Sequence, residues 1–236
     1  MKNKWFAFIR IFENESYIES SGISFNEFYN GINEKPLNIL VLKGHPNNTA
    51  FNYEHLFHYI TSENVVEFTK SNVYDYGDFC WVDFTNSKHL DDLSNKQLAE
   101  LLFFAHKAKP LLSHYFSDLD NKYSYCSHDD DWFVRVFMEE TKNYLSVIEY
   151  KLLTELKGRK KHISPLPDAI LGYIYNLAKD GIIIDFENSF TTGVMIYKAG
   201  PVDNLDSIHK TLDKCRKNLN GLCLGYNSKS HKWRLI

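Results

Sequence analysis

Short stretches in which apolar and polar residues alternate recur along the first half of the chain. Residues 5–12 alternate in this way, and after a polar turn at 13–16 a second stretch at 17–20 completes a predicted β-hairpin. Further strands are predicted at residues 38–43 and 79–84. The most distinctive stretch is 122–137, KYSYCSHDDDWFVRVF, in which two aromatic-rich runs flank three consecutive aspartates. It predicts a central hairpin with an acidic turn.

Helix starts are marked by two capping-box patterns, Ser24 with Glu27 and Ser94 with Gln97. In such a box the serine hydroxyl accepts an N–H from the first helical turn, while the longer side chain reaches back to the serine N–H. Apolar residues at helical spacing continue beyond the second box and recur after the central hairpin. The predicted helices span residues 24–30, 62–68, 94–107 and 139–156. The segment at residues 51–72 is ambiguous, because Leu56, Phe57, Tyr59 and Ile60 are compatible with either a strand or a helical turn.

The C-terminal third shows a compact order of alternating patterns. A helix at 168–179 precedes two strands, a second helix and two final strands. These later elements are predicted at residues 182–187, 193–199, 204–219, 222–226 and 232–236. Helices segregated from antiparallel β-hairpins indicate an α+β fold rather than a doubly wound parallel sheet.

A break in the pattern at residues 158–167 divides the chain. Gly158 suits the C-terminal cap of the preceding helix, a run of basic residues follows, and Pro165 and Pro167 reset the backbone. We therefore expect two subdomains: an acidic N-terminal α+β domain at 1–157 and a small basic αββαββ subdomain at 168–236, joined by a basic, proline-containing linker.

Composition places the chain among globular proteins. With 44% hydrophobic and 15% aromatic residues it can bury a sizeable core. The apolar run near the N-terminus is short and interrupted by Arg10, so we expect neither a signal peptide nor a membrane span, and predict a soluble, cytoplasmic protein. The four cysteines are far apart and form no C-x-x-C pair, which favours reduced, mostly buried thiols.

Charge is unevenly distributed. Residues 1–150 contain 13 Lys+Arg and 22 Asp+Glu, a net charge of −9, whereas residues 151–236 contain 14 and 8, a net charge of +6. Two interpretations stay open: the charges complement one another within one fold, or the C-terminal part presents a cationic face to an anionic partner.

The acidic turn is the first candidate site. Asp129, Asp130 and Asp131, with Trp132 and Tyr125 nearby, would form an anionic, aromatic edge for recognition. The alternative is a metal site for a hydrolase or nuclease, because carboxylate and imidazole groups bind divalent ions. Its candidate ligands are His106, His128, Asp129 and Asp131, with Asp83 as a further candidate. A solvated hairpin turn is the plain structural interpretation of the same residues.

The basic run is the second candidate site. Arg159, Lys160 and Lys161 could contact phosphates without sequence preference, and the helix at 204–219 could widen that patch. Its basic residues are Lys210, Lys214, Arg216 and Lys217. This gives an alternative function in nucleic-acid binding; a solvated linker is the plain interpretation.

One local resemblance bears on function. Tyr76-Gly77-Asp78-Phe79, leading into Trp81-Val82-Asp83, resembles a strand segment of the SUKH superfamily, many of whose members are bacterial toxin-immunity proteins. The resemblance covers eight residues. It implies a binding role rather than catalysis.

Known catalytic patterns are missing from the sequence. There is no G-x-S-x-G, no H-E-x-x-H, and no glycine pattern for a P-loop or a dinucleotide. Tyrosine, tryptophan and phenylalanine, which are frequent at binding hot spots, are abundant. The sequence thus predicts a non-enzymatic binding protein of the regulatory, toxin-immunity or host–phage conflict type, with a protein partner and no cofactor.

Overall fold

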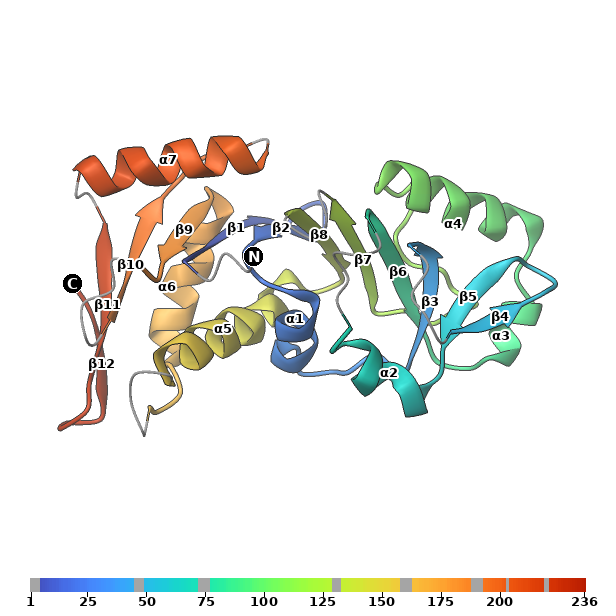
Figure 1. Ribbon diagram of the computed structural model, residues 1–236, viewed down its shortest axis with the longest axis horizontal. Coiled ribbons are helices and arrows are strands. Elements are labelled where there is room, and N and C mark those ends of the chain that lie inside the picture. Colours follow the sequence, from blue (N-terminus) through green and yellow to red (C-terminus); the bar gives the residue numbers. More distant parts are fainter. Residues whose placement is uncertain are drawn as a thin grey trace. The chain divides into compact units, whose positions relative to one another are not determined.

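The fold was analysed in a computed structural model of the chain. The structure describes residues 5–44, 49–71, 77–128, 133–157, 163–187, 193–202, 204–218 and 221–236. It combines helices with strands that pair in antiparallel fashion, as the sequence predicts (Figure 1). Over these residues no helix is long and apolar enough to cross a membrane.

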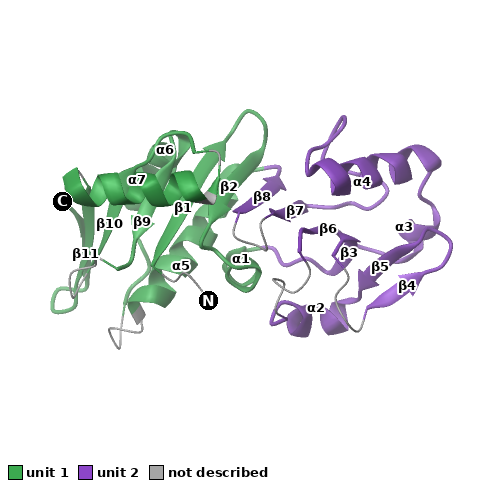
Figure 2. Cartoon of the chain, turned by 45° about the horizontal axis from the view of Figure 1, so that its top comes forward, with its two compact units in different colours: residues 1–33, 140–236 green, residues 34–139 purple. Residues whose placement is uncertain are grey.

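The chain divides into two compact units, shown in Figure 2. Unit 1 consists of residues 1–33 and 140–236, and unit 2 of residues 34–139. This division differs from the expected one, in which residues 1–157 and 168–236 formed separate subdomains. The physical reason is a long-range strand pairing, in which the N-terminal strand lies beside a strand that begins at Ile182.

Unit 1 is built on six strands in the order β12-β11-β10-β9-β1-β2. They are β1 (Phe6–Phe12), β2 (Tyr17–Ser21), β9 (Ile182–Asp185), β10 (Gly193–Lys198), β11 (Leu222–Asn227) and β12 (Lys232–Leu235). Its helices are α1 (Phe25–Gly31), η2 (Thr141–Tyr144, a 3₁₀ helix), α5 (Leu145–Lys157), α6 (Asp168–Lys179) and α7 (Leu205–Asn218). All four residues of β9 are buried, which requires cover on both faces of the sheet.

Helices supply this cover from both sides. The α6 helix packs on β1, and the His209 ring of α7 makes an edge contact with the Phe6 ring at 5.1 Å. In Figure 1, α7 runs above the strands of unit 1 while α5 and α6 lie below them. The helices of unit 1 are therefore distributed over both faces of its sheet, unlike the segregated arrangement that the sequence led us to expect.

Unit 2 also combines antiparallel strands with helices. Its six strands run in the order β8-β7-β6-β3-β5-β4. They are β3 (Asn38–Lys43), β4 (Ala50–Asn52), β5 (Phe57–Ile60), β6 (Phe79–Phe84), β7 (Tyr123–His128) and β8 (Phe133–Met138). Its helices are α2 (Ser62–Phe68), α3 (Lys88–Asp91) and α4 (Asn95–Lys107). Both α2 and α4 contact β3, and they lie on opposite sides of it in Figures 1 and 2.

Both predicted capping boxes are present. The Ser24 hydroxyl accepts the Glu27 N–H at the start of α1, and Ser94 accepts the Gln97 N–H at the start of α4. The predicted helix at 168–179 coincides with α6. In the ambiguous segment at 51–72, the described residues form a β-hairpin, β4 with β5, followed by α2.

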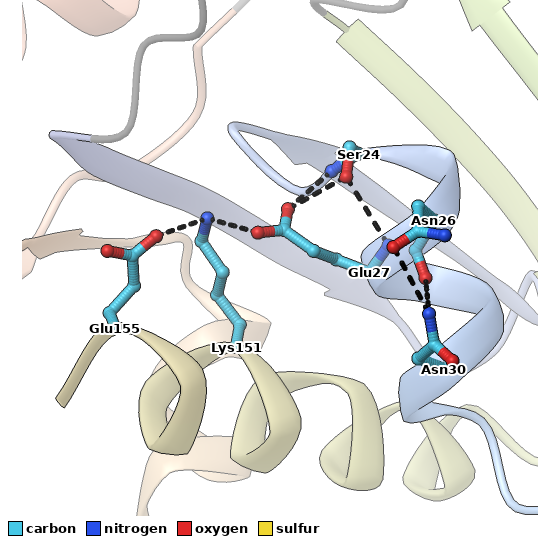
Figure 3. A network of polar contacts seen from close by, with 6 residues as sticks. All are labelled: Ser24, Asn26, Glu27, Asn30, Lys151 and Glu155. Atoms are coloured by element: carbon cyan, nitrogen blue, oxygen red, sulfur yellow. Dashed lines mark hydrogen bonds and ion pairs between the residues drawn. The ribbon is translucent and has the colours of Figure 1, made fainter. Parts of the chain in front are cut away.

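Buried charges fasten the helices of unit 1. Lys151 of α5 is only 2% exposed, and its Nζ donates to Glu27 Oε1 at 2.8 Å and Glu155 Oε1 at 3.0 Å (Figure 3). Glu27 also closes the capping box of α1, so one carboxylate joins two helices. Nearby, a Cβ at Gly31 would lie 2.6 Å from the Val147 Cα, so glycine is required for this close helix contact.

A second buried pair fastens α7. Asp185 of β9 is fully buried, and the Arg216 guanidinium donates to both of its oxygens at 2.8 Å. Arg216 also pairs with Glu187 at 2.8 Å. These hydrogen bonds raise the pKa of Arg216, which remains a cation at every accessible pH. Of the four basic residues assigned to a phosphate-binding patch, this one is therefore engaged in an internal ion pair.

Candidate functional site

The two predicted sites lie largely outside the described residues. This holds for Asp129, Asp130, Asp131 and Trp132 of the acidic turn and for Arg159, Lys160 and Lys161 of the basic run. The central hairpin itself is confirmed, because β7 and β8 pair from Tyr123 with Met138 to His128 with Phe133. The Tyr125 ring is fully buried and stacked on Trp81, so it belongs to the core of unit 2 rather than to an exposed recognition edge.

Of the residues named for a metal site, Asp129 and Asp131 lie outside the described residues. His106 is exposed on α4, and His128 is half-buried at the end of β7. In the part of the chain that the structure describes, no three His, Cys, Asp or Glu side chains gather as metal ligands would.

Asp83, the fifth metal-ligand candidate, forms hydrogen bonds with the backbone of unit 2. It lies in β6, is 4% exposed, and its Oδ1 accepts the backbone N–H groups of Lys122 at 3.0 Å and Tyr123 at 2.7 Å. Burial raises the pKa of Asp83 to about 6, although these backbone hydrogen bonds act in the opposite direction. The carboxyl group therefore fixes the chain at the start of β7.

Unit 2 also contains a buried histidine, His114. His114 is 8% exposed, and its ring packs against Phe137 with centroids 5.3 Å apart. Burial lowers the pKa of His114 to about 4, so the ring is neutral at pH 7. Burial also raises the pKa of Tyr115 to about 12. Neither the His114 Nε2 nor the Tyr115 hydroxyl has a hydrogen-bond partner among the described residues.

The Cys126 thiol of unit 2 is not activated as a nucleophile. Cys80 and Cys126 lie opposite each other on β6 and β7, with 3.7 Å between their sulfur atoms. Burial, with the hydrogen bond to Cys80, raises the pKa of Cys126 well above its usual value. A thiol that stays protonated is a poor nucleophile.

A different hairpin in unit 2 presents apolar side chains to solvent. The β4–β5 turn exposes Tyr53 at 85% and Leu56 at 72%. The Asn52 side chain closes the turn, since its Oδ1 accepts the N–H groups of Glu54 and His55, each at 3.0 Å. The Leu56 N–H donates to the Asn52 carbonyl oxygen at 2.9 Å.

The backbone of this turn is held in an unfavourable conformation. Leu56 has φ of 59°, in the left-handed region, which costs a non-glycine residue about 1–2 kcal/mol. The hydrogen bonds to Asn52 offset this cost. The strained backbone of Leu56 thus holds an apolar side chain in solvent at the outermost strand pair of unit 2.

Aromatic and acidic groups surround the same tip. The Phe51 ring makes edge contact with Tyr53 at 5.1 Å, and Asn52 Nδ2 donates to Asp91 Oδ1 of α3 at 3.4 Å. Glu54, Asp91 and the following Asp92 are exposed. Unit 2 as a whole contains 9 Lys+Arg and 16 Asp+Glu, a net charge of −7, against +4 for unit 1. We call the exposed side chains of Tyr53, Glu54, Leu56, Asp91 and Asp92 the hairpin tip.

Sequence reasoning missed the hairpin tip because a tyrosine and a leucine in an ambiguous segment are usually assigned to the core. The available signal was Asn52 followed by three polar or aromatic residues, a sequence that closes turns through the asparagine side chain.

The chain matches no protein-family model, no curated protein and no solved structure. The local resemblance of residues 76–83 to the SUKH superfamily therefore shows no family membership, although residues 79–83 do belong to a strand, β6. Functional inference rests on the geometry of the chain itself.

Proposed function

We propose that this chain is a non-catalytic binding protein that acts through contact with another protein, in a regulatory, toxin-immunity or host–phage conflict role. The observation that carries the proposal is the hairpin tip, where Tyr53 and Leu56 are held in solvent beside carboxylates. Tyrosine is enriched at binding hot spots, and apolar area gathered at one exposed point is typical of an interaction surface.

The charge of unit 2 defines the kind of partner. A net charge of −7 attracts a cationic protein surface and speeds its approach, and the attraction weakens as salt is added. Contact would then bury Tyr53 and Leu56 while Glu54, Asp91 and Asp92 pair with basic residues at the rim. Asp129, Asp130 and Asp131 are proposed to extend the same anionic character.

Comparative capture tests this function. The tagged chain and a variant carrying Tyr53→Ser and Leu56→Ser are used to capture proteins from an extract of the source cells, and the affinity of each captured protein is then measured in purified form. We expect the double variant to raise Kd about 30-fold or more, the loss of a typical hot spot of about 2 kcal/mol.

A matched control is Leu102→Ser, which removes another exposed leucine of unit 2, at 57% exposure, away from the turn. Equal capture by the wild type and the tip variant would contradict the role of the tip. A rise in Tm with Mg²⁺, Mn²⁺ or Zn²⁺, together with no specific capture, would favour the metal-dependent hydrolase instead.

A further inference from the structure

An open groove runs along helix α6 in unit 1. Its volume is about 420 Å³. Six lining residues come from α6, two from residues 142–145 and one from the β1–β2 turn. They are Asp168, Leu171, Gly172, Tyr175, Asn176 and Lys179, with Lys142, Leu145 and Glu13.

One end of the groove is organised by a chain of hydrogen bonds. The Thr141 and Tyr175 hydroxyls lie 2.8 Å apart, the Tyr175 hydroxyl donates to Glu13 Oε1 at 3.1 Å, and Lys179 Nζ lies 2.5 Å from Glu13 Oε2. The hydrogen bond from Lys179 lowers the pKa of Glu13, and Glu13 raises the pKa of Lys179. Both are ionised at neutral pH and neutralise each other.

Two further charges in the groove have no such compensation. Lys142 and Asp168 are exposed, and neither forms an ion pair among the described residues. Lys142 is close enough to lower the pKa of Glu13, which places it at the organised end. Asp168 is the first residue of α6 and Lys179 the last, about 16 Å apart at 1.5 Å per residue. The groove therefore has a cationic end and an anionic end.

Between Asp168 and Lys179, helix α6 lines the groove with Leu171, Gly172, Tyr175 and Asn176. Leu145 adds another apolar side chain. A Cβ placed on Gly172 would meet no atom within 4 Å, so this glycine leaves space rather than permitting a close contact. Glycine inside a helix costs about 0.5–1 kcal/mol relative to alanine.

We infer that this groove binds a short extended peptide segment with an acidic residue at one end, a basic residue at the other and apolar residues between them. A length of about 16 Å matches roughly five residues at about 3.3 Å each. Small-molecule sites enclose most of their ligand, whereas four of the lining residues here, Glu13, Lys142, Asp168 and Asn176, are exposed. The groove belongs to unit 1, so the inference is independent of the hairpin tip.

The probe is a fluorescent, end-blocked peptide Glu-Leu-Ala-Leu-Lys, compared with its neutral counterpart Gln-Leu-Ala-Leu-Gln, titrated with the full chain. We expect the dipolar peptide to bind about fivefold more tightly, because two exposed ion pairs each contribute up to about 1 kcal/mol. Equal affinity of the two peptides, or no binding of either, overturns the inference.

Variants of Gly172 test the location. Gly172→Trp fills the space beside this glycine and is expected to weaken dipolar-peptide binding at least tenfold, whereas Gly172→Ala, the matched control, retains it. Circular dichroism establishes that both variants are folded. Binding that is unchanged in folded Gly172→Trp would place the peptide elsewhere and overturn the assignment.

Charge reversal tests the polarity. Lys142→Glu or Asp168→Lys alone should abolish the preference for the dipolar peptide. The double variant should restore it, because the peptide can then bind in the opposite direction. A double variant that stays as weak as the single variants contradicts a dipolar groove.

Discussion

The two units differ in where their ion pairs lie. Unit 1 contains buried pairs, with Lys151 between two carboxylates and Asp185 fully buried against Arg216, in addition to the exposed pair of Lys179 with Glu13. In unit 2, each ion pair found among the described residues includes an exposed lysine, as in Lys70 with Glu67. Its buried polar groups are bonded mainly to backbone atoms, as Asp83 is.

This difference separates two uses of charge. A desolvated ion pair contributes little net stability but strongly penalises any arrangement that breaks it, so in unit 1 it specifies how helices dock. Carboxylates that remain in water do not constrain the fold in this way. Instead, they attract cationic molecules that approach the surface. Unit 2, whose carboxylates are mostly exposed, is accordingly the unit that carries the proposed recognition surface.

The largest expected effect comes from breaking a buried charge. Lys151→Ala leaves Glu27 and Glu155 without their shared cation, which should lower the free energy of unfolding of unit 1 by about 3–5 kcal/mol. Hydrogen exchange read by mass spectrometry resolves the loss to α1 and α5. Lys70→Ala, which breaks an exposed pair, should change stability by less than about 1 kcal/mol. Similar losses in the two variants would refute the contrast.

The next effect concerns the pH dependence of unit 2. The pKa of Asp83 is raised to about 6 from 3.8, so the folded state binds this proton more tightly, and stability falls as pH rises from about 4 to 6. Two pKa units correspond to about 3 kcal/mol. The pKa of His114 is lowered to about 4 from 6.5, so its contribution rises over the same window. The two contributions oppose each other.

Single variants should therefore expose each contribution. In Asp83→Asn, the amide oxygen can still accept both backbone N–H groups, and stability should rise between pH 4 and 6.5 because only His114 titrates. In His114→Phe, stability should fall between pH 4 and 6, because the contribution of Asp83 is then no longer opposed by that of His114. Urea unfolding at several pH values measures both slopes, and identical profiles in the two variants would be inconsistent with the assignment.

The smallest effect compares the two capping boxes. Ser94→Ala should destabilise unit 2 by about 1 kcal/mol, a typical value for a lost N-cap. Ser24→Ala should cost unit 1 more, because Ser24 also holds the Glu27 carboxylate that binds Lys151 (Figure 3). Chemical denaturation measures the loss in free energy of unfolding for each variant. A larger loss for Ser94→Ala than for Ser24→Ala would contradict this prediction.

Local elements could be predicted from the sequence, whereas their assembly could not. Capping boxes, the helix at 168–179 and the strands that follow it depend on neighbouring residues, and these predictions are confirmed. The pairing of Phe6 with Asp185 joins residues far apart in the chain, and no local pattern encodes it. The two units accordingly divide at residues 33/34 and 139/140, and not at the basic, proline-containing segment that the local pattern indicates.

The candidate sites show the same limit. Tyr125 and Tyr53 both lie in short aromatic stretches, yet one is fully buried and the other 85% exposed. Their difference arises from the position of the strand, since β7 pairs with a strand on each side while β4 is at the edge of its sheet. Strand order is a property of the whole fold, so exposure could not be derived from either stretch alone.

The insertion of unit 2 between Asn33 and Glu140 also sets an order of events on the ribosome. All of unit 2 has been synthesised by residue 139, when unit 1 consists only of one hairpin and α1. The partner strand of β1 begins at Ile182, 43 residues later, which corresponds to about 2–9 s of translation at about 5–20 residues per second. During that interval the edge of β1 that later pairs with β9 stays unpaired. A ribosome-associated chaperone that covers this edge would therefore raise the yield of folded chain.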